Sequence, residues 1–195
     1  MALGIESKLL STNARYPIAR VAMKYLTIGA QETARQFDSV YSGQLPDRIT
    51  MCIVRDAAMN GGYQQNPYNF EHLNVNQLVL YVNGEMYPTK PFAPNFATGQ
   101  YIREFNNMFQ ALGYLYTDKS VPISRSEFAN GFTIWAFDLT VDQSASRCTS
   151  PRRNGSVSLD IRFSAPTPVT INVICDAQFD SLIEIDKNRN VLINF

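Results

Sequence analysis

The feature that most constrains the fold is a pair of alternating apolar runs between Gly155 and Cys175. Apolar and polar side chains alternate along both runs, which is the two-residue period of a strand with one buried face. The apolar positions are Val157, Leu159, Ile161 and Phe163 in the first run, and Val169, Ile171, Val173 and Cys175 in the second. The connecting segment Ala165–Pro168 contains two prolines and favours a turn. We therefore predict that the two runs form an antiparallel β-pair with one buried face.

Most of the remaining apolar segments also have the composition of strands. Further strands are predicted over Ala14–Ile28, Arg48–Asp56, both sides of the hairpin signal Asn83-Gly84, Phe132–Leu139, Phe179–Ile185 and Val191–Phe195. In the first of these segments, a helix over Ile18–Leu26 is the competing interpretation. Phe132–Leu139 is apolar on both faces, which favours a central strand. Gly29–Ser42 is polar and is predicted to be a loop that ends in a short edge strand.

One segment has the period of a helix instead. Between Gly99 and Gly113, the apolar side chains recur at helical spacing and polar side chains occupy the opposite side. Gly113 is a typical helix stop. We predict one amphipathic helix here, within a connection of an otherwise all-β chain. A weaker capping-box match, Ser124-x-x-Glu127, predicts a single further helical turn.

The size and composition of the chain indicate one folded domain. It has 195 residues, of which 45% are hydrophobic and 17% are charged. This is apolar enough to build a core, and the light charge indicates a surface that packs against neighbours. We predict an N-terminal arm over residues 1–11 and a single domain over residues 12–195.

The charge balance and the cysteines limit the classes of partner and the cellular compartments to be considered. Lys plus Arg equals Asp plus Glu at 17 each, so no overall field attracts the chain to nucleic acid or to acidic membranes. No apolar run approaches the roughly 18 residues of a membrane span, and nothing marks the chain for secretion. The odd set Cys52, Cys148 and Cys175 favours free thiols in a reducing compartment over a disulfide framework.

No set of residues predicts a catalytic centre, a cofactor site or a metal site. His72 is the single histidine, so any Ser-His-Asp or Cys-His centre would depend on it, and we interpret it as an ordinary polar residue. The arginines of the predicted surface loop Gln143–Asn154 lack the interleaved aromatic residues typical of nucleic-acid binding. The densest acidic group matches no calcium-loop spacing and is interpreted as a solvated strand edge; it comprises Asp176, Asp180, Glu184 and Asp186.

Aromatic residues in the predicted connections have two interpretations. They either pack within their own loops or contact another subunit, since such side chains bury much area at a small entropic cost. The candidate contact residues are Tyr63, Tyr68, Phe92 and Phe96, together with Arg152 and Arg153. The candidate contact segments are Met1–Ser11, Tyr63–Asn69 and Gln143–Asn154.

An ordered set of short motifs resembles a known family. The motifs are Ala14–Ile18, Gly43–Pro46, Asn66–Phe70, Leu80–Gly84 followed by Pro88 and Pro91, Tyr101–Gly113, Phe128–Phe132 running into Ala136–Leu139, Ile183–Asp186 and Arg189–Val191. In this order they resemble the C-terminal half of the hexon-like, double-jelly-roll major capsid proteins of Polinton/Maverick-type elements and adintoviruses. They also resemble the related uncharacterised proteins of nematodes and other animals. The set spans nearly the whole chain.

The resemblance implies an antiparallel jelly-roll sandwich and a structural role without catalysis. Such capsid proteins carry two jelly rolls in tandem, and three chains make a capsomer, whereas this chain has room for one jelly roll. The resemblance therefore implies self-association, as a homotrimer, with a companion jelly roll, in a virion assembled in the host cytoplasm or nucleus. A different class remains open: a cellular jelly-roll binding module, lectin-like or receptor-like, domesticated from a viral element.

Overall fold

The computed structural model describes Lys8 and residues 12–115, 117–118, 121–141, 143 and 151–194. The predicted arm over residues 1–11 lies outside the described residues, apart from Lys8. The same holds for most of the predicted loop Gln143–Asn154.

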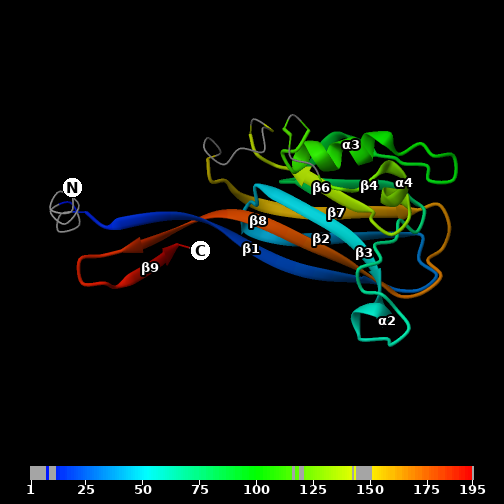
Figure 1. The fold of residues 1–195 in the computed structure, drawn as a ribbon, viewed down its shortest axis with the longest axis horizontal. Coiled ribbons are helices and arrows are strands. Elements are labelled where there is room, and N and C mark those ends of the chain that lie inside the picture. Colours follow the sequence, from blue (N-terminus) through cyan, green and yellow to red (C-terminus); the bar gives the residue numbers. More distant parts are fainter. Residues whose placement is uncertain are drawn as a thin grey trace.

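Two antiparallel sheets face each other and form a β-sandwich (Figure 1). The first sheet has the order β1 (Ala14–Ile28), β8 (Ile171–Ile185), β3 (Arg48–Arg55) and β6 (Ile134–Asp138), and β9 (Val191–Asn194) also pairs with β8. The second sheet has the order β2 (Ala34–Gln44), β7 (Asn154–Phe163), β4 (Val75–Val82) and β5 (Glu85–Phe92). The prediction of an all-β jelly-roll sandwich is confirmed.

The core lies between the sheets and is built from alternating residues of both. In β7, Leu159 and Ile161 are 0% exposed, and in β8 Ile171 is 0% and Val173 is 1% exposed. The polar residues between them point the other way, as the sequence period requires. The predicted buried faces of these two strands are therefore confirmed, except that Val169 is 38% exposed and precedes β8.

The predicted pairing of these two strands is wrong. β7 pairs with β2 and β4, whereas β8 pairs with β1 and β3, so residues 164–170 cross from one sheet to the other. The crossing segment is held at the end of the sandwich, because the Thr167 hydroxyl donates to the Gly29 carbonyl at 2.8 Å. A two-residue period specifies which face is buried, and two strands that face each other across a sandwich about 10 Å thick satisfy it as well as a hairpin does.

The predicted central position of Phe132–Leu139 is also wrong. The strand in this segment, β6, pairs with β3 alone and lies at an edge of its sheet. Its outer face is covered by helix α3 (Ile102–Ala111), whose Asn107 side-chain amide donates to the Ala136 carbonyl at 2.5 Å. The helix, rather than a neighbouring strand, accounts for the two apolar faces of this segment.

Two strands are longer than predicted. The predicted loop Gly29–Ser42 contains most of the edge strand β2, which runs from Ala34 to Gln44 with a register shift between Phe37 and Tyr41. The two predicted strands at Ile171 and Phe179 are one continuous strand, β8. The irregular residues of β2 obscure its period, because a bulge moves the following side chains to the other face.

The local signals are confirmed. Asn83 and Gly84 have φ angles of 55° and 85° and join β4 to β5. The predicted amphipathic helix is α3, and Ser124 and Glu127 form a capping box on the single-turn helix α4 (Arg125–Ala129). A further helical turn, α2 (Asp56–Met59), follows β3. Within the described residues, no helix is long and apolar enough to cross a membrane.

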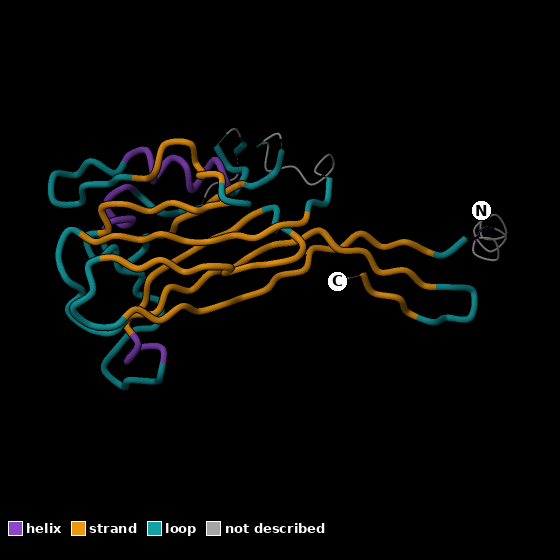
Figure 2. The backbone as a smooth tube through the Cα atoms, turned by 180° about the vertical axis from the view of Figure 1, so that it is seen from behind, coloured by secondary structure: helices purple, strands orange, loops and turns teal. Residues whose placement is uncertain are grey.

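β1 and β8 extend beyond the sandwich as a ribbon. They pair over their whole lengths, from Ala14 opposite Ile185 to Ile28 opposite Ile171, whereas β3 pairs with β8 only as far as Gln178. Beyond that point β9 adds a third strand, and the ribbon projects from the body in both views (Figures 1 and 2). We name this projection the arm and define it as Ala14–Ala19, Asp180–Ile185 and Val191–Asn194.

Candidate subunit-contact surface

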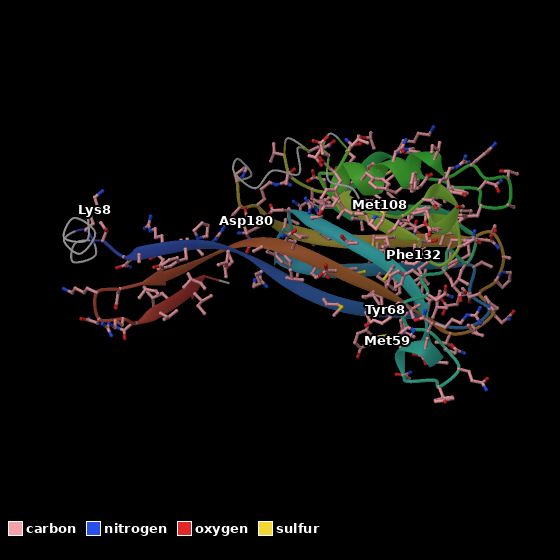
Figure 3. All side chains as sticks on the ribbon, in the orientation of Figure 1. Lys8, Met59, Tyr68, Met108, Phe132 and Asp180 are labelled. Carbon is pink, nitrogen blue, oxygen red and sulfur yellow. The ribbon has the colours of Figure 1, made fainter. Side chains whose placement is uncertain are left out.

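The side chains of the two predicted contact tyrosines do not pack within their own loop. Tyr63 is 102% exposed and Tyr68 is 74% exposed, in the connection between α2 and β4 at one end of the sandwich (Figure 3). The backbone there is fixed by local bonds, since the Asn66 side-chain oxygen accepts from the Tyr68 amide at 2.9 Å. Of the two sequence interpretations, packing within the loop therefore does not apply to these two residues.

The structure corrects the placement of Phe92. It lies in strand β5 rather than in a connection, is 2% exposed, and packs with ring centroids 5.3 Å from Phe137 and 6.2 Å from Trp135. A side chain so enclosed has almost no surface left for a partner. The sequence did not show this because Pro88 and Pro91, which usually mark connections, lie within the edge strand.

Phe96 is partly buried and takes part in the second apolar cluster of the molecule. This cluster lies under α3 and α4, around Met108 and Phe128. The Phe96 ring stacks on His72, with centroids 4.0 Å apart, and on Tyr101, with centroids 5.1 Å apart. Phe96 therefore holds the helices against the sandwich.

The two predicted contact arginines are exposed just before β7. Arg152 is on the surface, while the Arg153 guanidinium donates to the Leu139 carbonyl and links this segment to the end of β6. Arg147 lies outside the described residues. Arg152 thus remains a candidate contact, and Arg153 also has a role within the fold.

His72 has the surroundings of a packed residue rather than of a catalytic base. Burial lowers the pKa of its imidazole, and Nδ1 accepts the Asn74 amide hydrogen at 2.9 Å. One face is covered by Phe96. The imidazole is thus held neutral, with one nitrogen already occupied.

The acidic residues are dispersed along the outer side of β8 and the arm. Glu184 pairs with Arg15 at 2.9 Å. In the turn at the arm tip, Asp186 accepts from the side-chain amide of Asn190 at 2.9 Å and from the backbone amides of Asn190 and Asn188. Those hydrogen bonds lower the pKa of Asp186. Within the described part of the chain, no three His, Cys, Asp or Glu side chains come together in a way that could hold a metal ion.

A pocket of about 440 Å³ lies between β5, α3 and β6. Tyr87 is a half-buried polar residue of its lining, and its hydroxyl donates to the Asp138 carbonyl. Burial raises the pKa of Tyr87 to about 12, so the phenol stays protonated. The other polar lining groups are Thr89, Arg103, Asn106, Asn107, Gln110, Asp138 and Gln143, and they include no nucleophile beside a base.

Two exposed apolar stripes were not singled out in the sequence. On the outer face of β1, Val21, Met23 and Tyr25 are 58%, 71% and 64% exposed. On the arm, Tyr16, Val191 and Ile193 are 53%, 56% and 44% exposed. Apolar residues on both faces of Ala14–Ile28 are the sequence signal for such stripes. From the sequence alone, we interpret them only as evidence for a strand.

Comparisons with known proteins agree with this fold. No family model matches the chain. The chain is 21% identical to Uncharacterized protein F54H12.2 of Caenorhabditis elegans over 194 residues, which covers 97% of this chain and 45% of that protein. The chain therefore spans less than half of that relative.

Solved structures from virus particles share the fold. A chain in the Sputnik virophage structure matches with a TM-score of 0.55 and 17% identity, over 94% of this chain and 39% of that one. PBCV-1 VP54, fitted into a reconstruction of Sputnik, matches with a TM-score of 0.59 and 8% identity, over 98% and 54%. The PBCV-1 virus capsid matches with a TM-score of 0.53 and 10% identity, over 94% and 52%. These are structural proteins of capsids rather than enzymes.

Proposed function

We propose that this chain is a structural, capsid-type protein that self-associates to build a viral or virus-derived shell, without catalysis. The observation that carries the proposal is the jelly-roll sandwich, which matches capsid structures over 94–98% of the chain. Fold alone does not imply function, so the surface must support the role as well. It does so with exposed tyrosines and apolar stripes on a rigid body.

The physical basis of the role is a closely packed interior combined with exposed aromatic and apolar side chains on the surface. The core residues from the two sheets are almost fully buried, so the body has little freedom to deform when neighbours press on it. Exposed aromatic residues such as Tyr63 and Tyr68 bury large areas on contact with another copy. A subunit of this kind acts through its surface rather than through a reactive pocket.

The assembly follows from the same proposal. We expect one domain over residues 12–195 behind the separate N-terminal arm over residues 1–11, and homotrimeric subunits in a virion assembled in a reducing host compartment. A companion jelly roll fits the lengths of the capsid chains, of which this chain covers 39–54%. Tyr63, Tyr68 and Arg152 are the proposed contact residues.

Size-exclusion chromatography with light scattering tests the proposal. We expect the 195-residue chain to form stable trimers or larger rings, because its exposed stripes and tyrosines are covered only in an assembly. A clean monomer that retains a glycan or a peptide would instead establish the binding-module alternative.

A further inference from the structure

The arm extends past the end of the second sheet. The face of the first sheet that the second sheet covers in the body therefore continues into the arm. In the body, the inner face of β8 is buried under the second sheet, from Ile171 to Phe179. The same alternation continues into the arm with Ile183 and Ile185 on β8. Their cross-strand partners on this face are Tyr16 and Ala14 on β1, and Ile193 and Val191 on β9. We name these six residues the arm stripe.

The described part of the chain provides no cover for the arm stripe. The second sheet ends with the body, and the arm projects past it (Figures 1 and 2). Tyr16, Val191 and Ile193 are therefore about half exposed, although they continue a core pattern. Small three-stranded ribbons need a covered apolar face for stability.

A second stripe lies on the opposite face of the same sheet, in the body. Val21, Met23 and Tyr25 alternate along β1 and point away from the core, and Ile174 of β8 lies beside Tyr25. We name these four residues the body stripe. Neither stripe contains a charged residue, so copies of the chain meet there without like charges opposed.

We infer that the arm stripe of one copy packs on the body stripe of another copy. This inference rests on the proposed self-association and specifies its geometry. β1 and β8 cross between the arm and the body, so the ribbon turns over between the two stripes (Figure 1). Each arm can lie on the body of its partner in a two-fold pair, or on the body of the next copy in a closed ring, and both arrangements cover both stripes.

The area of the arm indicates that one contact is not enough for a stable assembly. Strands of six, six and four residues, at about 3.3 Å per residue and about 4.8 Å between strands, present roughly 250 Å². That is below the roughly 800 Å² per partner of a stable dimer. In a two-fold pair or in a closed ring, each copy makes the contact twice, once with its arm and once with its body.

Charges beside the two stripes are complementary. The arm tip carries the exposed cations Lys187 and Arg189, whereas Asp176 and Asp180 flank β1 on the outer face, opposite Met23 and Ala19. Burial raises the pKa of Asp176, so this carboxyl gains when a cation approaches it. An arm laid along the outer face brings these groups together.

The test uses the whole chain with single substitutions in each stripe. Ile193→Lys disrupts the arm stripe, Met23→Lys disrupts the body stripe, and Leu192→Lys is the matched control, since Leu192 is 55% exposed on the opposite face of β9. By light scattering, we expect the wild type and L192K to be oligomers, and I193K and M23K to be monomers with unchanged thermal melting. Mixing I193K with M23K leaves one intact contact, and we expect a weak heterodimer that neither variant forms alone.

Each other outcome identifies what has failed. A monomeric wild type overturns the proposed function and this inference together. A wild-type oligomer that persists in I193K overturns the inference alone, and so does an oligomer that I193K breaks but M23K does not, because that pattern indicates arm–arm pairing. If I193K unfolds, a benzoylphenylalanine at Ile193 decides: the inference requires a cross-link to Val21–Lys24 of another copy, and a cross-link to another arm contradicts it.

Discussion

Aromatic side chains in this chain divide between interior and surface, although their sequence surroundings are alike. Phe92 and Tyr68 each follow a proline closely, yet Phe92 is 2% exposed and Tyr68 is 74% exposed. The difference arises from long-range contacts, since Phe92 meets Trp135 and Phe137 of a strand far along the chain. The contribution of Phe92 to stability follows from this burial.

Removing the Phe92 ring is expected to destabilise the fold strongly. Phe92→Ala leaves a cavity beside two aromatic rings and should lower the free energy of unfolding by about 3–5 kcal/mol. Tyr68→Ala removes a ring of similar size from the surface and should change it by no more than about 0.5 kcal/mol. Urea denaturation measures both values, and similar losses in the two variants would contradict the assigned burial.

The buried thiol of Cys175 and the half-buried thiol of Cys52 predict a decline of stability in alkali. Burial raises the pKa of Cys175 from 9.0 to about 12 and that of Cys52 to about 11, so the folded state keeps protons that the unfolded state loses. The unfolding free energy should therefore be constant below about pH 8 and fall as the pH rises from 9 toward 11. Urea melts from pH 7 to 10 measure this, and Cys175→Ala should decline less steeply; an equal slope in both proteins would exclude the thiol as the cause.

Local sequence signals predict the individual elements, but they do not predict which element lies beside which. The Asn83-Gly84 turn, the α3 helix and the Ser124 capping box were predictable because each depends on residues within a few positions of one another. The pairing of β7 and β8 was not, because alternation gives the buried face but not the hydrogen-bonded neighbour. The edge position of β6 was hidden for the same reason, since a helix and a strand cover an apolar face equally well.

The β4–β5 hairpin offers a prediction at this scale. Gly84 has a φ angle of 85°, which costs an alanine about 1 kcal/mol but costs an asparagine less. Gly84→Ala should therefore lower the unfolding free energy by about 1 kcal/mol, and Gly84→Asn by about half of that. Thermal melts of the two variants compare them directly. A loss in G84N as large as that in G84A would show that something other than the backbone angle limits the turn.

At the scale of the molecule, the sequence identified the sandwich and two of its exposed aromatic residues. Tyr63 and Tyr68 were recognised because they lie in a connection without a strand period, and the structure exposes them both. The arm stripe was missed, because Ile183 and Ile185 have the pattern of a buried strand. No local pattern shows where the opposite sheet ends, and that end decides whether such residues are core or surface.

The two exposed stripes and the tyrosine loop give the molecule several exposed apolar and aromatic faces. In the proposed capsid-type role these faces make the contacts between subunits, so the role is lost when the contacts are lost. Surface substitutions that leave the melting temperature unchanged should therefore still abolish its role if they lie on the stripes.

Electron microscopy of the purified wild-type chain tests the central claim most directly. If the chain is a capsid-type subunit, images should show closed rings or sheets in which identical subunits repeat side by side. Single separate particles of the size of one chain, at every concentration up to the solubility limit, would contradict it.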